Sequence, residues 1–270
     1  MNNIKLKIAV IGCGWLGAPL AEELLKDGHE VHGTSRDVGK LTPLVENGLI
    51  AHEVTESFSN AQLDWLKNCE VLVLNIPPSN FKSSYANKMC EIARNLPSTA
   101  RVIFVSSTSV YADKNETVTE TTPTDGTNRS GPYVIEAEEA LANEFGKRIT
   151  IVRMAGLIGG TRHPAKFMAG KSISGGLAPV NLIHLTDCIG ILKSVIHQNY
   201  WGKIINACAP KHPEKKAYYT HFCKQLNLTP PTFEENKGDF KIVSAEKVQK
   251  ELNYKFVFED PYDFVLDDVS

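Results

Sequence analysis

The feature that most constrains the fold of this chain is a glycine pattern close to its start. An apolar run over residues 6–11 leads directly into Gly-x-Gly-x-x-Gly, at Gly12, Gly14 and Gly17, and a helical pattern follows as far as Lys26. Gly12 allows a tight turn, Gly14 lets the backbone approach a pyrophosphate, and Gly17 lets the helix pack closely on the strand. The helix N-terminus then offers N–H groups and a positive dipole end to the phosphates. This order predicts dinucleotide binding, and a plain turn is the alternative.

Strand and helix patterns alternate through the first 155 residues, which is typical of a doubly wound, parallel α/β sheet. We therefore expect a Rossmann-like domain over residues 1–158. The pattern loosens afterwards, so residues 159–270 are expected to form a smaller substrate-capping subdomain, with about 181–207 returning to the main sheet. The predicted strands are 6–11, 30–34, 49–54, 70–76, 101–105, 150–153 and 181–185, and the predicted helices are 16–26, 85–95, 133–145, 186–197, 218–226 and 245–252.

Composition excludes several classes of function. Lys and Arg total 29 and Asp and Glu total 31, a net charge of −2, so there is no basic stripe for nucleic acid or for an anionic membrane. The apolar runs have the length of strands and are far short of a membrane span. No room is left for a signal peptide before the first strand. Six cysteines without a C-x-x-C pair indicate reduced thiols in a cytoplasmic protein, and no metal-ligand spacing occurs.

The end of the second predicted strand indicates which dinucleotide is bound. An NAD site usually places Asp or Glu about 20 residues past the glycines, to accept a hydrogen bond from the ribose. Here the strand runs into Thr34, Ser35 and Arg36, and Asp37 lies just beyond it. Since a guanidinium pairs with phosphate by charge and geometry, a hydroxyl followed by arginine suits a 2′-phosphate. We predict NADP, with NAD possible; Arg36 as a solvated loop residue is the alternative.

Three further segments resemble the extended short-chain dehydrogenase/reductase family, the NAD(P)-dependent epimerase/dehydratase group. They are 104–111, 151–159 and 181–187, and the resemblance covers nearly the whole chain. It is closest to the short "atypical" bacterial members. The resemblance implies that Ser107 donates a hydrogen bond to a substrate carbonyl and that Tyr133 exchanges a proton with the substrate oxygen. It also implies a small-molecule substrate and a monomer or homodimer.

The chain departs from the family where a lysine should follow that tyrosine by four residues. The position is Ala137, and its neighbours are Glu136 and Glu138. In the family this lysine lowers the pKa of the tyrosine and holds the nicotinamide ribose. A free phenol with a pKa of about 10 is roughly 0.1% ionised at pH 7, so losing the cation forgoes about 4 kcal/mol. A cation from elsewhere is needed for family-type chemistry, and we interpret residues 136–139 as a solvated helix face.

The candidate site residues fall into three groups. Ser107 and Tyr133 are the catalytic candidates. The alternatives are a plain strand-end serine that caps backbone for Ser107 and an ordinary aromatic residue at a helix start for Tyr133. Substrate contacts are expected from Thr108, Arg162 and His163, the last two from a loop that often meets an anionic group in the family; a surface loop is the alternative. The cofactor-binding candidates are Gly12, Gly14, Trp15, Leu16, Gly17, Ser35, Arg36, Ile76, Pro77, Pro78, Ser106, Met154, Ala155 and Gly156.

Three functions are compatible with this sequence. The first is an NAD(P)-dependent oxidoreductase or epimerase/dehydratase-like enzyme. The second is a non-catalytic sensor or regulator that reads the NADP(H) redox state, which the missing lysine favours. The third is a scaffold with a vestigial nucleotide site, which predicts that no dinucleotide binds.

Overall fold

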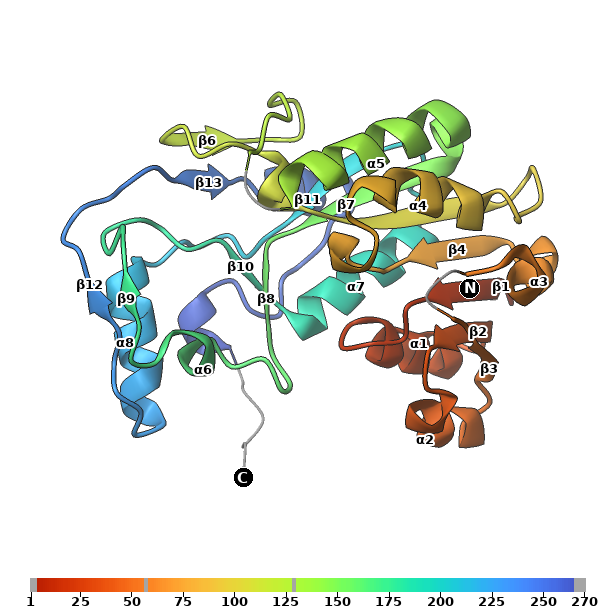
Figure 1. The fold of residues 1–270 in the computed structure, drawn as a ribbon, viewed down its shortest axis with the longest axis horizontal. Helices are drawn as coiled ribbons and strands as arrows, with labels where there is room; N and C mark the ends of the chain where they lie inside the picture. Colours follow the sequence, from red (N-terminus) through yellow and green to blue (C-terminus); the bar gives the residue numbers. More distant parts are fainter. Residues whose placement is uncertain (1–3, 56–57, 128–129, 265–270) are drawn as a thin grey trace. The chain divides into compact units, whose positions relative to one another are not determined.

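A computed structural model describes residues 4–55, 58–127 and 130–264 (Figure 1). The chain forms two compact units. The first comprises Met1–Ser107, Thr127–Val152 and Leu192–Ile205, and the second comprises Thr108–Gly126, Arg153–Ile191 and Asn206–Ser270. The chain thus passes from one unit to the other several times. The division at residue 158, with about 181–207 returning to the main sheet, stays a prediction.

The main sheet has seven strands in the order β3-β2-β1-β4-β5-β7-β11. Ile8 pairs in parallel with Val31 on one side and with Val71 on the other. The strand order reverses between β1 and β4, which defines a doubly wound sheet. The predicted Rossmann-like α/β fold is therefore confirmed. The strands are β1 (Lys7–Ile11), β2 (Glu30–Ser35), β3 (Ile50–Glu53), β4 (Val71–Leu74), β5 (Arg101–Ser107), β7 (Ile149–Met154) and β11 (Ile204–Ala207).

Helices cover both faces of this sheet within the first unit. Figure 1 shows α1 (Gly17–Lys26) on one side and α4 (Tyr85–Ala93) and α5 (Gly131–Phe145) on the other. Because both faces are covered, every residue of β4 is buried, as expected for a central parallel strand. The short helices are η1 (Val38–Leu41), α2 (Thr42–Glu46), α3 (Asn60–Leu63), η2 (Asp64–Asn68), η3 (Pro78–Asn80), η4 (Lys82–Ser84) and η6 (Gly146–Arg148).

The second unit contains three small parallel strand pairs: β8 (Gly156–Ile158) with β10 (Leu182–His184), β9 (Ser172–Ile173) with β12 (Thr232–Phe233), and β6 (Glu116–Val118) with β13 (Lys241–Val243). The segment expected at 181–185 therefore pairs with β8, and β11 is the strand that lies in the main sheet. The helices are η5 (Thr108–Val110), α6 (Pro164–Met168), α8 (Lys215–Gln225), α9 (Glu246–Glu251) and η7 (Pro261–Asp263), while α7 (Leu185–His197) belongs partly to each unit.

A buried carboxylate, Asp187, organises the second unit. It is fully buried and accepts hydrogen bonds from the Tyr254 hydroxyl at 2.9 Å, the Val257 N–H at 2.8 Å and the Phe258 N–H at 3.1 Å. Burial raises the pKa of Asp187 above its ordinary value, and the three hydrogen bonds oppose that rise. A buried carboxylate is stable only when donors surround it, so Asp187 fixes the segment around residues 254–258.

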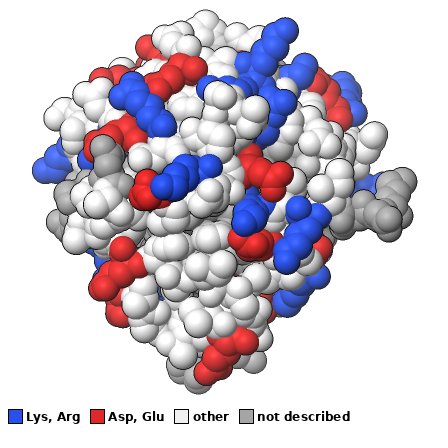
Figure 2. Space-filling model, turned by 90° about the vertical axis from the view of Figure 1, so that its right-hand side faces the viewer, with Lys and Arg blue, Asp and Glu red and all other residues white. Residues whose placement is uncertain are grey.

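Lys and Arg side chains are intermixed with Asp and Glu on the face shown in Figure 2. Within the described ranges, no helix has both the length and the apolar character needed to cross a membrane. All six cysteines are free, and five of them are buried.

Candidate dinucleotide-binding and active site

The loop between β1 and α1 can be built only with glycine at two of its positions. Gly12 has a φ of +100°, and a Cβ there would lie 2.5 Å from the carbonyl oxygen of Asn75. A Cβ on Gly17 would overlap the carbonyl oxygen of Gly12. Both positions exclude every L side chain by sterics, so the first and third glycines have the roles that the motif assigns them.

The middle glycine is different because it borders open space. A Cβ on Gly14 would have no described heavy atom within 4 Å, and the residue is exposed. Behind it, α1 begins at Gly17 with Leu16 as its N-cap, without a side-chain cap and without an acidic residue in the first turn. The first N–H groups of a helix lack intrahelical acceptors and carry partial positive charge. An anionic pyrophosphate therefore fits this loop both sterically and electrostatically.

Two polar side chains that the sequence did not single out hold the loop. The Gly12 N–H donates to Thr34 Oγ1 at 2.9 Å, and Asn75 Nδ2 donates to the Gly12 carbonyl at 3.1 Å. Both residues lie toward the carboxyl ends of strands that flank β1. This position in the sequence pattern could have identified them as residues that support the loop. Next to them, burial raises the pKa of the Cys13 thiol to about 12, so it stays protonated at neutral pH.

The end of β2 leads into the exposed Arg36 and then into Asp37, which has one carboxylate oxygen bound to the backbone. Ser35 Oγ donates to the Asp37 carbonyl at 2.8 Å, and Asp37 Oδ1 accepts the Gly39 N–H at 3.1 Å. Asp37 is thereby committed to capping η1. Arg36, between them, is exposed. The second oxygen of Asp37 lies 3.6 Å from Lys40 Nζ, so an exposed arginine and a partly engaged carboxylate follow the strand end.

The chain turns sharply at the end of β4, beside the point where the strand order reverses. Ile76 is buried, and its carbonyl accepts the Tyr85 hydroxyl at 2.7 Å. Pro77 is exposed and precedes η3, which starts at Pro78. Ligands of doubly wound sheets bind at this switch point, so the three residues border the position expected for a ligand.

The catalytic candidates lie where β5 ends and α5 begins, and these two elements pack together. Ser107 is the last residue of β5, and Tyr133 is in the first turn of α5; both are half-buried. One turn further along α5, Ala137 is fully buried. The position of the family lysine is therefore a methyl group in the core.

The neighbouring Glu138 corrects the interpretation of this helix. Residues 136–139 were predicted to form a solvated face, but Glu138 is only 5% exposed and accepts the Ser106 hydroxyl at 2.5 Å. Glu136 and Glu139 are exposed as expected. Helical periodicity puts position 138 on the same inner face as Val134 and Leu141, and this spacing could have identified the buried carboxylate.

The second unit holds the other predicted residues. Thr108, Met154 and Ala155 are buried, and Gly156 is exposed. The buried His163 accepts the Ala165 N–H at Nδ1, 3.2 Å away, as the N-cap of α6, and burial lowers its pKa. A ring engaged in capping has little freedom to turn toward a ligand. The substrate roles of Thr108, Arg162 and His163 stay predictions.

A buried network in the second unit includes a tyrosine that follows Ser107 by four residues. The Tyr111 hydroxyl accepts Arg153 Nη1 at 2.7 Å and donates to Asn206 Oδ1 at 2.8 Å. The Asn206 N–H in turn donates to Glu120 at 2.7 Å. Burial raises the pKa of Tyr111, although Arg153 acts in the opposite direction. Tyr111 is thus held as a structural residue.

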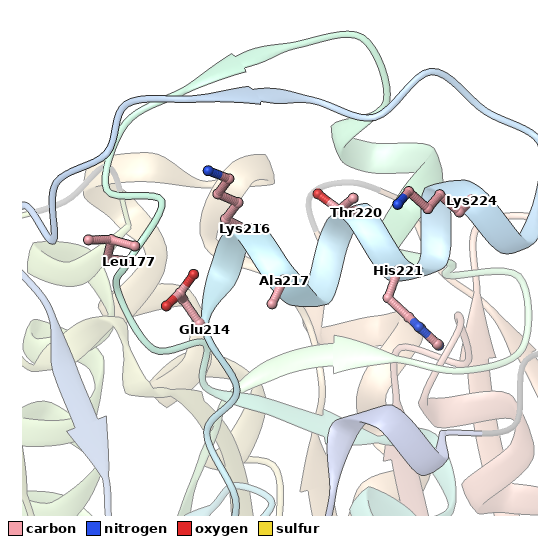
Figure 3. A pocket seen from close by; sticks show the side chains of 7 residues that line it. All are labelled: Leu177, Glu214, Lys216, Ala217, Thr220, His221 and Lys224. Carbon is pink, nitrogen blue, oxygen red and sulfur yellow. The ribbon is translucent and has the colours of Figure 1, made fainter.

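A shallow pocket follows one side of α8 in the second unit (Figure 3). The side chain of Lys216 at its rim pairs with Glu235 at 2.8 Å. None of the candidate site residues lines this pocket. Its lining residues are Leu177, Glu214, Lys216, Ala217, Thr220, His221 and Lys224.

Three potential metal ligands come together in the first unit: Asp27, His29 and His197. Lys193 Nζ lies 3.0 Å from Asp27 Oδ2, so a cation already meets this carboxylate. His29 Nδ1 accepts the Leu6 N–H at 3.3 Å, which puts the proton of a neutral ring on Nε2. Asp27 Oδ2 also lies 3.1 Å from His197 Nε2, so the contacts of this group are those of an ion-pair cluster.

Comparison with known proteins identifies the family. The family model described as "NAD dependent epimerase/dehydratase family" matches residues 8–181. The chain belongs to this family. It is 35% identical over 269 residues to Protein YeeZ of Escherichia coli (strain K12), covering 94% of this chain and 97% of YeeZ.

Two solved structures share the fold of this family member at low sequence identity. The dTDP-glucose 4,6-dehydratase of Bacillus anthracis str. Ames, in complex with NAD, superposes with a TM-score of 0.78 at 16% identity, covering 94% of this chain and 93% of that chain. The UDP-glucuronic acid 4-epimerase of Bacillus cereus, also with NAD, gives a TM-score of 0.77 at 18% identity, covering 94% of each chain. The two names describe the activities of those proteins. For this chain, the superpositions establish only the shared fold.

Proposed function

We propose that this member of the epimerase/dehydratase family is an NADP-dependent oxidoreductase or epimerase/dehydratase-like enzyme. The observation that carries the proposal is the loop at Gly14, which is open to an incoming ligand and backed by the uncapped start of α1. The exposed Arg36, and the hydrogen bond that holds Asp37 Oδ1 on the Gly39 N–H, support the choice of NADP. Such a coenzyme, when bound, accepts or donates a hydride.

Two residues of the first unit, Ser107 and Tyr133, act on the substrate in this proposal. Ser107, at the end of β5, donates a hydrogen bond to a substrate carbonyl oxygen and polarises it. Tyr133, at the start of α5, gives a proton to that oxygen or takes one from it. Both side chains are half-buried, which leaves each of them a surface that a ligand can touch.

The buried Ala137 limits this chemistry and favours a second candidate function. With no lysine one turn after Tyr133, the cationic stabilisation of about 4 kcal/mol that the family uses is lost unless another cation supplies it. A protein that binds NADP(H) without turnover, as a redox sensor or regulator, needs no such cation. Both the enzyme and the sensor would bind the coenzyme in the first unit.

For the substrate, we infer a small polar molecule that carries a carbonyl or carbinol carbon, with sugar nucleotides as the first class to test. The family membership supports this class, and the fold is shared with enzymes named for dTDP-glucose and UDP-glucuronic acid. We also infer a cytoplasmic protein that is a monomer or a homodimer. Light scattering on the purified protein tests the oligomeric state.

The decisive experiment separates binding from turnover. Purified protein is titrated with NADPH and NADH, and then incubated with NADP⁺ or NADPH and a panel of carbonyl compounds and sugar nucleotides. We expect tighter binding of NADPH, and turnover that is lost in Tyr133→Phe but kept in the surface control Tyr262→Phe. Binding without turnover would support the sensor. No binding of either coenzyme at millimolar concentration would overturn both candidates.

A further inference from the structure

We propose that Glu138 is a positioning residue for the two catalytic candidates, Ser107 and Tyr133. Its carboxylate accepts the Ser106 hydroxyl, and this hydrogen bond holds the end of β5 on α5, so that the two candidates keep a fixed relative position. This role rests on the proposed function, since Ser107 and Tyr133 act on the substrate there.

The Ser106–Glu138 hydrogen bond joins the two elements that carry the candidates. Ser106 precedes Ser107 on β5, and Glu138 lies further along α5 than Tyr133. The hydroxyl donates to the carboxylate at 2.5 Å, and both residues are 5% exposed. Inside a protein such a hydrogen bond is stronger than in water, because solvent does not compete for its partners. The pair therefore ties the end of the strand to the helix.

The end of β5 depends on this contact because it extends beyond the neighbouring strand β4. The register of the two strands pairs Leu74, the last residue of β4, with Phe104. The strand β5 continues past this pair to Ser107, which leads directly into η5. Successive side chains of a strand point to opposite sides. An anchored Ser106 thus also sets the direction in which Ser107 points.

Proton transfer and carbonyl polarisation both require such precision. The two heavy atoms of a proton transfer must lie within about 2.6–3.2 Å of each other, and a displacement of about 1 Å can lower a rate by about a hundredfold. The buried Glu138 acts on this geometry through Ser106. Coenzyme affinity should depend on it little, because the side chains of Thr34 and Asn75 hold the glycine loop.

The test is a double-mutant cycle on kcat, with the substrate that the panel of carbonyl compounds and sugar nucleotides identifies. Glu138→Met removes the acceptor at similar volume, and Glu138→Gln keeps an oxygen that accepts from Ser106. Glu138→Met is also combined with Ser107→Ala, which removes the hydroxyl that Glu138 positions. Glu139→Met, on the exposed side of the same helix, is the matched control. Calorimetry gives the coenzyme Kd of each variant, and kcat is measured well below each melting temperature.

We expect Glu138→Met to lower kcat by about tenfold to a hundredfold, because the Ser107 hydroxyl is displaced. Glu138→Gln should retain most of the wild-type kcat, Glu139→Met all of it, and the coenzyme Kd should be unchanged in all three. In the Ser107→Ala background, Glu138→Met should cost little further activity, because coupled residues are not additive.

An equal loss of kcat in both backgrounds, or a wild-type kcat in Glu138→Met, overturns the positioning role while the proposed function stands. If Glu138→Met does not fold, Ser106→Ala breaks the same hydrogen bond and takes its place in the cycle. A wild-type protein that turns over no substrate is a different outcome, which removes the proposed enzyme and the role of Glu138 with it.

Discussion

The two ends of the candidate site differ in how closely they follow the rules of their family. At the end of β1, glycine is required at positions 12 and 17 and open space surrounds position 14. At the end of β5, the expected lysine is a buried alanine, and a buried carboxylate holds the neighbouring serine. The first region keeps the steric requirements of its motif, while the second lacks the lysine of its family.

This difference shows that binding and chemistry are separate requirements on the same sheet. The glycine loop depends on backbone shape, which few sequences can provide. The β5–α5 region depends on the charge of single side chains, which can change without disturbing the fold. The four predictions below test this separation.

The largest effect is expected from the glycines. Gly17→Ala places a Cβ against the Gly12 carbonyl, so we expect a loss of about 3 kcal/mol of unfolding free energy and of all coenzyme binding. Gly14→Ala meets no described atom within 4 Å and should unfold at the wild-type temperature while binding coenzyme at least tenfold more weakly. Thermal melts and coenzyme fluorescence titrations measure both. Equal melting temperatures for the two variants would contradict the steric argument.

The Ser106–Glu138 pair should contribute to stability and little to phosphate binding. Ser106→Ala removes a hydroxyl donor from a buried carboxylate, which should cost about 2 kcal/mol in urea unfolding. Wild-type stability in Ser106→Ala would contradict a contribution from this hydrogen bond.

A smaller effect is expected at the end of β2. Arg36→Ala should weaken NADPH binding about tenfold and leave NADH binding unchanged, because NADH has no 2′-phosphate. Lys40→Ala is the control, since this exposed cation lies 3.6 Å from Asp37. Calorimetry at low and moderate salt measures both coenzymes. A parallel loss of NADH affinity would remove Arg36 as the selectivity residue.

The smallest effect concerns pH, and it arises on β3 in the first unit. His52, on β3, stacks on Trp65 at 3.9 Å between ring centroids, and burial lowers its pKa from 6.5 to about 4. The folded protein therefore holds fewer protons than the unfolded chain between these values. Stability should be complete above pH 6.5 and fall by about 1 kcal/mol as the pH drops to 4, after allowance for solvent screening.

Melting curves of His52→Gln from pH 7 to 4 measure this contribution, and we expect a shallower slope than in the wild type. His221→Gln, an exposed histidine on α8, is the matched control and should leave the slope unchanged. An unchanged slope in His52→Gln would assign the pH dependence to other histidines.

The sequence was sufficient to predict features that depend on backbone pattern. The glycine spacing and the apolar strands predicted the doubly wound sheet, and the element boundaries agree within a few residues. The β5 strand runs two residues further than expected, to Ser107, and the Ser106 hydroxyl donates to Glu138. That hydrogen bond joins residues 32 positions apart, and no local pattern contains it.

Side-chain partners were harder to predict for the same reason. Thr34 and Asn75 support the loop from strands on either side of β1, and only the packed sheet brings them together. The loop motif predicted that His163 contacts the substrate, yet its ring caps the adjacent helix. A histidine before proline can accept a backbone N–H as readily as it can contact a ligand. A run of charged residues on a helix does not predict which of them are buried unless the 3.6-residue periodicity is also considered, as Glu138 shows.

The Asp187 carboxylate has a consequence for biosynthesis. Its three donors are residues that the ribosome adds 67, 70 and 71 positions later. Until those residues emerge, this carboxylate cannot be buried without a large desolvation cost, so the second unit should mature after translation has passed residue 258. The glycine loop, which needs partners only up to Asn75, can assemble on a much shorter nascent chain.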